Sequence, residues 1–205
     1  MGLFLLILLL GYLLGSTPSG YLAGRWCKGI DLRDLGSGST GATNVLRQVG
    51  KGPALIVFLI DVAKGAAAVL LAASLSTNLS DGLNNWLQVM AGLAALAGHI
   101  WPLWLGFKGG KAVATGFGLF LGLAWPVGLA CFGLFLTTLS LSRIVSLASV
   151  VAAMALPLLM AAGPSPNTAN LTVAVVAMAL VIWRHRSNLK RIAAGTEPRL
   201  GQPKS

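Results

Sequence analysis

The chain has 205 residues, of which 56% are hydrophobic and only 10% are charged, and its mean hydropathy is +0.80. Ordinary soluble domains carry about 25% charged residues, so the composition excludes a water-soluble domain and predicts an integral membrane protein. The net charge of +10 would suggest a nucleic-acid partner in a soluble protein. Here the basic residues stand in short turns beside apolar segments, so we expect no nucleic-acid partner.

Apolar runs divide the chain into membrane-helix candidates. A helical span needs about 20 mostly apolar residues, and polar stretches separate seven such runs. They are Leu3–Leu22, Pro53–Leu75, Trp86–Trp104, Ala112–Leu123, Val127–Leu141, Ser146–Ala161 and Leu171–Trp183. Because these runs leave only short loops and show no alternating pattern, residues 1–205 are predicted to form one all-α polytopic membrane domain with seven transmembrane helices rather than a barrel.

The placement of basic residues favours seven crossings over six. The fourth and fifth runs are short and are separated only by Trp125 and Pro126, so a single broken span is the alternative. All of the 15 basic residues except Lys64 follow the first, third, fifth or seventh run. They are Arg25, Lys28, Arg33, Arg47, Lys51, Lys108, Lys111, Arg143, Arg184, Arg186, Lys190, Arg191, Arg199 and Lys204. The positive-inside rule then places the N-terminus outside and the C-terminus in the cytoplasm.

The first cytoplasmic connection contains a glycine-rich motif, G-S-G-S-T-G-A-T-N-V-L-R over Gly36–Arg47. Its G-x-G-x-x-G letters do not indicate a dinucleotide fold, because no strand precedes them and no acidic residue follows at the required distance. Small residues still gather backbone N–H groups around an anion, and Arg47 adds a guanidinium fork. We therefore interpret the stretch as a phosphate-binding loop, with a merely flexible loop as the alternative.

The second cytoplasmic connection places Lys108 and Lys111 on either side of a Gly109–Gly110 pair and close to His99. The glycine pair would let the backbone approach a ligand between two ammonium groups. Two lysines in a cytoplasmic turn also follow from topology alone. The nearby histidine and glycines make an anion site the preferred interpretation.

The third connection and the C-terminal tail add further polar groups. Ser146 follows the basic Arg143, and His185 and Asn188 stand three residues apart, hence on one face if the last span continues as a helix. The alternative for the tail is a basic helix attracted to anionic lipid.

The second apolar run contains an ionisable pair, Asp61 and Lys64, three residues apart. Ionisable groups at membrane depth are costly and are usually paired. We expect this pair to position other groups rather than to relay protons. Cys27 and Cys131 lie in unrelated segments, so neither a disulfide framework nor a metal site is indicated.

Three stretches together resemble the bacterial acyl-phosphate:glycerol-3-phosphate acyltransferase family. They are Gly36–Arg47, Gly98–Thr115 (G-H-I-W-P-L-W-L-G-F-K-G-G-K-A-V-A-T) and His185–Glu197 (H-R-S-N-L-K-R-I-A-A-G-T-E). Segment lengths and order match over essentially the whole chain. One departure is Ser39, because the family commonly has Asn directly after the first G-S-G.

The resemblance implies a seven-helix enzyme of the bacterial inner (plasma) membrane whose active site faces the cytoplasm. Such an enzyme transfers a fatty acyl group from acyl phosphate to the 1-hydroxyl of glycerol 3-phosphate, yielding 1-acyl-glycerol 3-phosphate and phosphate. This is the first committed step of phospholipid synthesis. The expected partners are these two substrates and membrane lipids, with no metal or other cofactor.

The resemblance also implies roles for individual residues. Those expected to be catalytic are Ser37, Arg47, Lys108 and His185. Those expected to contact substrate or phosphate are Gly38, Thr43, Asn44, Lys111, Ser146 and Asn188. Glu197 would orient its neighbours, and the residues expected to be structural are Asp61, Lys64 and His99.

The residues favour direct acyl transfer. A mixed anhydride is already activated, so positioning and charge neutralisation suffice without a covalent nucleophile. The pattern of a His followed five residues later by Asp, which acyl-CoA acyltransferases often show, is missing, because the positions five residues after His99 and His185 are Trp104 and Lys190. The base is then His185 or a phosphate oxygen of the substrates. A small anion or phosphate-ester transporter is the alternative function, although no internal repeat is visible and the polar motifs crowd on one side.

Overall fold

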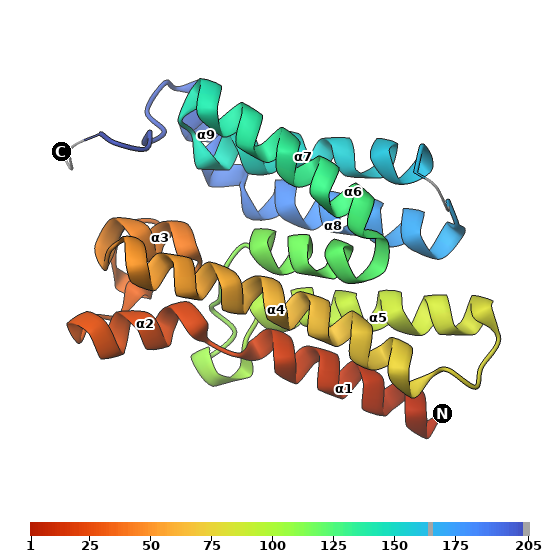
Figure 1. Cartoon of the computed structure of the whole chain (residues 1–205). Helices are drawn as coiled ribbons and strands as arrows, with labels where there is room; N and C mark the ends of the chain where they lie inside the picture. The colour runs from red at the N-terminus through yellow and green to blue at the C-terminus, as the bar shows by residue number, and fades with distance from the viewer. Residues whose placement is uncertain (164–165, 203–205) are drawn as a thin grey trace. The chain divides into compact units, whose positions relative to one another are not determined.

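The computed structural model describes residues 1–163 and 166–202, and within these ranges it contains α-helices, two 3-10 helices and no strand (Figure 1). The chain divides into two compact units, Met1–Leu123 and Ala124–Ser205. The predicted all-α architecture is therefore confirmed. Lys204, which belongs to the predicted basic tail, lies outside the described residues.

The first unit is a helical bundle. Its elements are α1 (Gly2–Ser16), α2 (Ser19–Lys28), η1 (Leu32–Asp34), α3 (Ala42–Gln48), α4 (Lys51–Leu75), α5 (Asp81–Ile100), η2 (Leu103–Leu105) and the first part of α6 (Val113–Ser142). Helix α1 packs against both α4 and α5, and α3 packs against α4.

Small residues let α1 and α5 come close together. A Cβ atom at Gly11 would lie 2.6 Å from the carbonyl oxygen of Ala91, and one at Gly15 would lie 2.1 Å from that of Ala95. Glycines four residues apart allow this close backbone approach in membrane helices. The first unit is thus held together by tight helix packing, while large side chains of α4 such as Leu55 and Leu59 stay exposed, as lipid-facing residues do.

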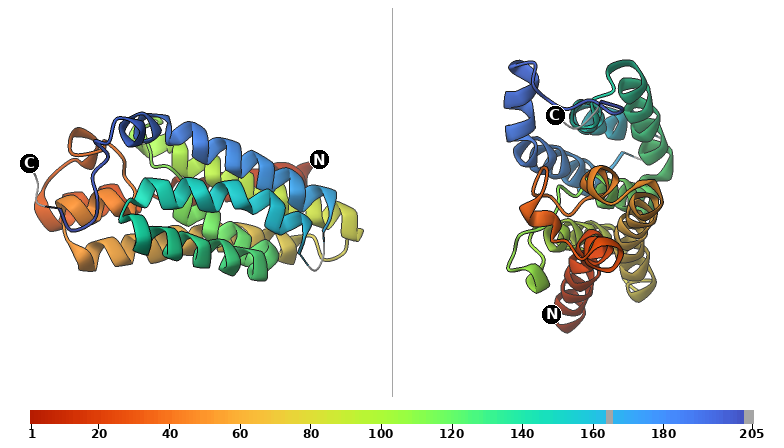
Figure 2. Two further views of the ribbon diagram at one scale, coloured as in Figure 1. Left: turned by 90° about the horizontal axis from the view of Figure 1, so that it is seen from above. Right: turned by 90° about the vertical axis from the view of Figure 1, so that its left-hand side faces the viewer.

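The second unit contains the rest of α6 together with α7 (Val145–Ala161), α8 (Thr168–Arg184) and α9 (Arg186–Ala193). Helix α7 packs against α8 and α9. The chain bends by 59° between α8 and α9. The right-hand view of Figure 2 shows that these two helices point in different directions. The predicted last span therefore does not continue as one straight helix, because His185 lies at the bend with non-helical ψ.

The predicted spans correspond to apolar helices, but the lengths of these helices do not by themselves give seven crossings. Among the residues that the structure describes, four regions are long and apolar enough to cross a membrane, or five if the bent α8–α9 pair is one span. They include a 27-residue region made of α1 and α2, and α7 is apolar but shorter. An integral, multi-pass helical protein is thus supported, whereas the seven crossings and the sidedness of the termini stay predictions.

Helix α6 contains the break expected between the fourth and fifth runs. Ala124 has φ −154° and ψ 73°, which is not helical, and Pro126 follows two residues later. Proline lacks an N–H group and clashes with the preceding turn, so it disfavours a continuous helix here. The break coincides with the boundary between the two compact units.

Candidate active site

Asn44 organises the glycine-rich loop. Its side-chain Nδ2 donates to the carbonyl oxygens of Leu32 (3.0 Å), Leu35 (3.0 Å) and Ser39 (2.9 Å). Its Oδ1 accepts from the backbone N–H of Ser37 at 3.4 Å. Asn44 is almost fully buried at 1% exposure. Both the oxygen and the nitrogen of the amide are thus hydrogen-bonded within the loop. Asn44 therefore shapes the loop, which is a different role from the phosphate contact predicted for it.

The loop itself presents small residues at the surface. Gly36 and Gly38 have φ of 61° and 66°, the left-handed region that favours glycine. A Cβ atom at Gly36 would also lie 2.5 Å from Oδ1 of Asn44. Ser37 and Gly38 are exposed. The loop therefore has a defined backbone shape with an exposed hydroxyl group, and its predicted binding of phosphate stays a prediction.

Helix α3 follows the loop and carries its remaining predicted residues. Thr43 and Arg47 are four residues apart on this helix, so they lie on the same face. Both side chains are half-buried. Ser37 and Gly38 in the loop and Thr43 and Arg47 on the helix after it thus belong to one continuous segment, in which the first two are exposed and the last two are half-buried.

The second loop folds back onto the end of α5. The backbone N–H of Gly110 donates to the carbonyl of His99 (3.0 Å), and that of Gly109 donates to the carbonyl of Ile100 (3.1 Å). A Cβ atom at Gly110 would lie 2.1 Å from Nε2 of His99. The glycine pair thus packs closely against the end of α5, and the predicted approach of the backbone to a ligand at this pair stays a prediction. Lys108 stays exposed beside it.

Two residues of this loop have strained backbone. Phe107 and Ala112 have φ of 62° and 58°, which non-glycine residues rarely adopt. Such conformations cost about 1–3 kcal/mol each and persist only where the surroundings fix them. They flank the segment that carries Lys108 and Lys111.

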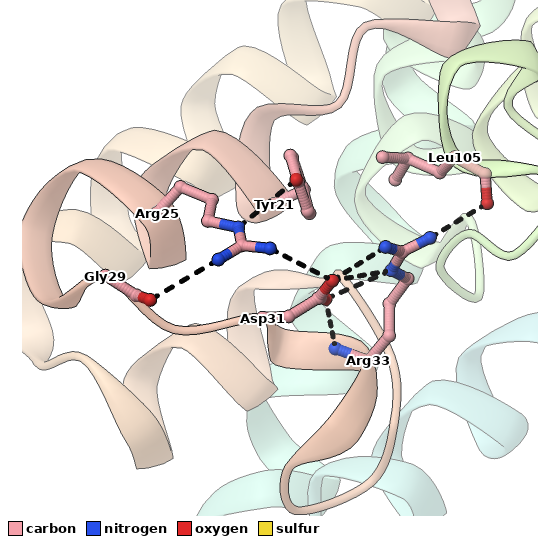
Figure 3. A network of polar contacts seen from close by, with 6 residues as sticks. All are labelled: Tyr21, Arg25, Gly29, Asp31, Arg33 and Leu105. Atoms are coloured by element: carbon pink, nitrogen blue, oxygen red, sulfur yellow. Dashed lines mark hydrogen bonds and ion pairs between the residues drawn. The ribbon is translucent and has the colours of Figure 1, made fainter.

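A network that sequence reasoning missed joins the two loops (Figure 3). The guanidinium of Arg33 binds the carboxylate of Asp31, with a shortest distance of 2.6 Å between Nη2 and Oδ2. Its Nη1 donates to the carbonyl of Leu105 at 3.0 Å. This hydrogen bonding by Arg33 holds the pKa of Asp31 at about 2, below its usual range. The sequence signal for this pair is an Asp-x-Arg spacing, which by itself predicts Arg33 only as a basic residue of the cytoplasmic connection.

Asp61 and Lys64 pair inside the first unit, as predicted. Nζ of Lys64 lies 2.8 Å from Oδ1 of Asp61, and both side chains are buried. Ser19 donates to the same carboxylate oxygen at 2.7 Å, and Lys64 donates to the carbonyl of Thr17 at 3.2 Å. The pair thereby links α4 to the junction between α1 and α2.

His99 extends this buried cluster to α5 and α6. Its Nδ1 lies 3.1 Å from Oγ1 of Thr115 and 3.6 Å from Oδ1 of Asp61. His99 and Lys64 also line a small pocket together with Thr40 of the glycine-rich loop. These contacts join Asp61, Lys64 and His99 in one buried cluster, and their structural role stays a prediction.

Glu197 is the centre of a polar cluster in the second unit. Its Oε1 accepts from Ser146 (2.7 Å) and from Nδ2 of Asn188 (2.6 Å), and its Oε2 accepts from Nε of Arg191 (2.7 Å). Burial alone would raise the pKa of this carboxyl, but the three hydrogen bonds outweigh that effect and lower it. The charged carboxylate thus fixes two predicted site residues, as an orienting group would.

His185 has a defined orientation at the α8–α9 bend. Its Nδ1 lies 2.8 Å from the carbonyl oxygen of Val181. A carbonyl only accepts, so Nδ1 carries the proton and Nε2 of the neutral ring is an acceptor. His185 is buried at 3% exposure. A histidine that acts as a general base through Nε2 requires this tautomer.

The region from residue 5 to residue 195 matches the family model described as glycerol-3-phosphate acyltransferase. The chain belongs to the glycerol-3-phosphate acyltransferase family. The glycerol-3-phosphate acyltransferase of Parasynechococcus marenigrum (strain WH8102) is 72% identical over 97% of this chain and 90% of its own length. That of Synechococcus sp. (strain CC9902) is 71% identical over 97% of this chain and 96% of its own length.

Solved structures of the family share the fold. The glycerol 3-phosphate form of PlsY, an integral membrane glycerol 3-phosphate acyltransferase, is 40% identical, with a TM-score of 0.88 over 97% of this chain and 96% of that chain. The lysophosphatidic acid form gives 39% identity and a TM-score of 0.85. The predicted resemblance and the acyltransferase class are thus confirmed, and the transporter alternative has no support.

Within each unit, the family's expected site residues fall into groups. In the first unit they occupy two loops and a buried cluster; in the second they surround Glu197 and the α8–α9 bend. Among the residues that the structure describes, no group of three or more His, Cys, Asp or Glu side chains is placed to hold a metal ion.

Proposed function

We propose that this acyltransferase moves a fatty acyl group from acyl phosphate to the 1-hydroxyl of glycerol 3-phosphate. The observation that carries the proposal is that PlsY, similar over nearly the whole chain, has been crystallised in a glycerol 3-phosphate form and in a lysophosphatidic acid form. These two ligands are the acceptor and the product of the proposed reaction.

The transfer needs no covalent acyl-enzyme. The glycerol hydroxyl oxygen attacks the acyl carbonyl carbon, the bond between that carbon and the phosphate oxygen breaks, and inorganic phosphate leaves. The hydroxyl proton passes to a base. Because acyl phosphate is an activated mixed anhydride, orientation and neutralisation of charge supply the remaining catalysis.

Residues of the first unit are proposed to bind the phosphate groups. Arg47 offers a bidentate guanidinium, and Ser37, Gly38, Thr43 and the loop shaped by Asn44 offer hydroxyl and backbone groups. Lys108 and Lys111 are proposed to bind the phosphate of glycerol 3-phosphate.

A second group of expected site residues is proposed to act on the reacting hydroxyl. His185 is proposed as the base through Nε2, since its Nδ1 donates to Val181. Ser146 and Asn188 are proposed substrate contacts, oriented by Glu197 through its hydrogen bonds to both. The alternative base is a phosphate oxygen of the substrates, and replacement of His185 distinguishes between the two.

The chain is proposed to form one domain that crosses the bacterial inner membrane seven times, with the N-terminus outside and the active site facing the cytoplasm. The helix break at Ala124 supports counting the two parts of α6 as separate crossings. In a background with Cys27 and Cys131 replaced by serine, a cysteine at Asn78 or Trp125 should react with an impermeant maleimide from outside. One at Ser187 should react only after the membrane is opened. An unreactive Trp125→Cys would favour six crossings.

The test of activity uses the purified full chain in lipid with radiolabelled glycerol 3-phosphate, given acyl phosphate or acyl-CoA in parallel reactions. Labelled lysophosphatidate from acyl phosphate alone supports both the enzyme and its donor. Labelled product from acyl-CoA alone would overturn the assignment of acyl phosphate as the donor. A folded preparation that makes no lipid from either donor would overturn the proposed reaction.

A further inference from the structure

Arg33 uses all parts of its guanidinium to hold two segments that are far apart in the chain. Nε and Nη2 bind the Asp31 carboxylate at 2.6–3.2 Å. Nη1 donates to the carbonyl of Leu105, 72 residues away, at 3.0 Å (Figure 3). An arginine fork can serve a carboxylate and a third acceptor at once, whereas a lysine ammonium lacks this fixed geometry.

The Leu105 end of this bridge fixes the turn that carries Lys108. Leu105 is the last residue of η2 and is followed by Gly106 and Phe107, both with positive φ. The strained turn needs outside contacts to persist. Its own amides contribute, since Phe107 N–H donates to the carbonyl of Pro102 at 3.0 Å. The bond from Arg33 comes from a different segment and therefore fixes the turn relative to the first loop.

The Asp31 end fixes the start of the glycine-rich loop. Asp31 accepts from the backbone N–H of Arg33 at 3.0 Å and so caps η1. The segment from η1 leads directly into that loop, and the carbonyls of Leu32 and Leu35 are held by Asn44. The ion pair is therefore continuous with the hydrogen bonds that shape the proposed phosphate loop.

Arg25 also lies near the carboxylate of Asp31, but it differs from Arg33 in its other contacts. Its Nη2 lies 3.8 Å from Oδ2 of Asp31, and its side chain is 46% exposed, against 28% for Arg33. Both guanidinium groups lie over the ring of Tyr21, at 5.5 Å and 5.3 Å from its centroid. Arg25 shares the charge, the carboxylate and the aromatic ring, but its described contacts do not include the second loop.

We infer that Arg33 is a positioning residue that sets the second loop against the glycine-rich loop and so holds Lys108 where it binds the phosphate of glycerol 3-phosphate. The assignment of Lys108 to that phosphate rests on the proposed function. The positioning of the turn by Arg33 does not, so the two parts are tested separately.

The first test measures the turn itself by amide hydrogen–deuterium exchange on the full chain in lipid. Arg33→Lys keeps a cation for Asp31 but cannot also hold Leu105, and Arg33→Gln removes the charge. Both should speed exchange of the amides of Phe107, Gly109 and Gly110, while Arg25→Lys should leave that exchange as in the wild type. Wild-type exchange in folded Arg33→Lys protein would overturn the inference, whether or not the chain has the proposed activity.

The second test compares the KM for glycerol 3-phosphate, the KM for acyl phosphate and kcat in the variants. Loss of a hydrogen bond to a charged group corresponds to about a tenfold or larger change in an equilibrium constant. We therefore expect Arg33→Lys to raise the KM for glycerol 3-phosphate by about tenfold, with a much smaller change in the KM for acyl phosphate and in kcat. Arg25→Lys should change none of the three values by more than about twofold.

Two outcomes separate the inference from the proposed function. A wild-type chain that makes no lysophosphatidate contradicts the proposed function, and the exchange measurement then still decides the role of Arg33. An active wild type whose Arg33→Lys variant has a lower kcat but an unchanged KM for glycerol 3-phosphate overturns the inference and leaves the function standing.

Discussion

Ser146 donates a hydrogen bond of 2.7 Å to Glu197, although 51 residues separate the two in the chain. The same carboxylate accepts from Asn188 and Arg191, so all three of these partners are hydrogen-bond donors. A single buried acid therefore fixes two residues of the proposed site.

Replacing Glu197 by Gln should destabilise this cluster and lower activity. The amide of Gln brings two N–H donors into a position where Ser146, Asn188 and Arg191 already donate, so at least one donor loses its acceptor. Hydrogen bonds to charged groups contribute about 1.5–3 kcal/mol each. We expect a loss of about that size in the free energy of unfolding and a clear drop in kcat. Asp81→Asn, at an exposed carboxylate, is the matched control; equal Tm and activity for both variants would contradict the role of Glu197.

The pH dependence of stability should reveal the Asp31–Arg33 pair. The pKa of Asp31 is about 2 in the folded chain, below its ordinary value of about 3.9. Since the folded pKa is the lower one, the stabilisation is present above the unfolded value and is lost as the pH falls through the folded value. Asp31→Asn should therefore have a lower Tm than the wild type at pH 6, and the difference should shrink from about pH 4 to about pH 2. A difference in Tm that stays constant over this range would contradict the pair; exposed Asp34→Asn is the control.

The sequence predicted those features whose signals are local. The apolar runs gave the helices, the Trp125–Pro126 step predicted the break now located at Ala124, and the three-residue spacing of Asp61 and Lys64 predicted their pairing. Each depends on residues within a turn or two of one another, where spacing alone fixes which side chains meet.

The features that sequence reasoning missed depend on contacts between distant segments. Nothing in the local pattern places Arg33 against Leu105, or shows that the glycine pair at 109–110 is shaped by the ring of His99. The phosphate contact that the family resemblance implies for Asn44 stays a prediction, but the sequence did not show that the amide of Asn44 donates to the carbonyls of its own loop. Such tertiary contacts are decided by packing, and a single sequence does not record them.

Lys108→Ala should weaken binding of glycerol 3-phosphate. An exposed ammonium that neutralises a phosphate acts on ground-state binding, so its loss raises KM more than it lowers kcat. We expect the KM for glycerol 3-phosphate to rise by about tenfold or more, because a charge-assisted hydrogen bond is lost. Lys51→Ala, at an exposed lysine at the start of α4, is the control. A Lys108→Ala protein with normal turnover at low glycerol 3-phosphate would contradict the assignment.

Replacing His185 decides between the two bases. If Nε2 of His185 accepts the hydroxyl proton, His185→Ala should lower kcat by about 10²–10⁴-fold with a smaller change in KM. Near-normal kcat in folded His185→Ala protein would instead assign the base to a substrate phosphate oxygen. His99→Ala does not serve as a control because His99 is part of the buried cluster; Ser187→Ala, at an exposed neighbour on α9, does.

Gly110→Ala tests whether the glycine pair serves packing or ligand approach. The added Cβ would meet the ring of His99 at 2.1 Å, so overpacking should cost about 1–3 kcal/mol of folding free energy. Gly133→Ala is the matched control, because a Cβ there meets nothing within 4 Å and alanine is the better helix former by about 0.5–1 kcal/mol. Thermal unfolding in detergent should thus show a lower Tm for Gly110→Ala and an equal or higher Tm for Gly133→Ala. If Gly110→Ala kept the wild-type Tm but lost affinity for glycerol 3-phosphate, the pair would be serving the ligand after all.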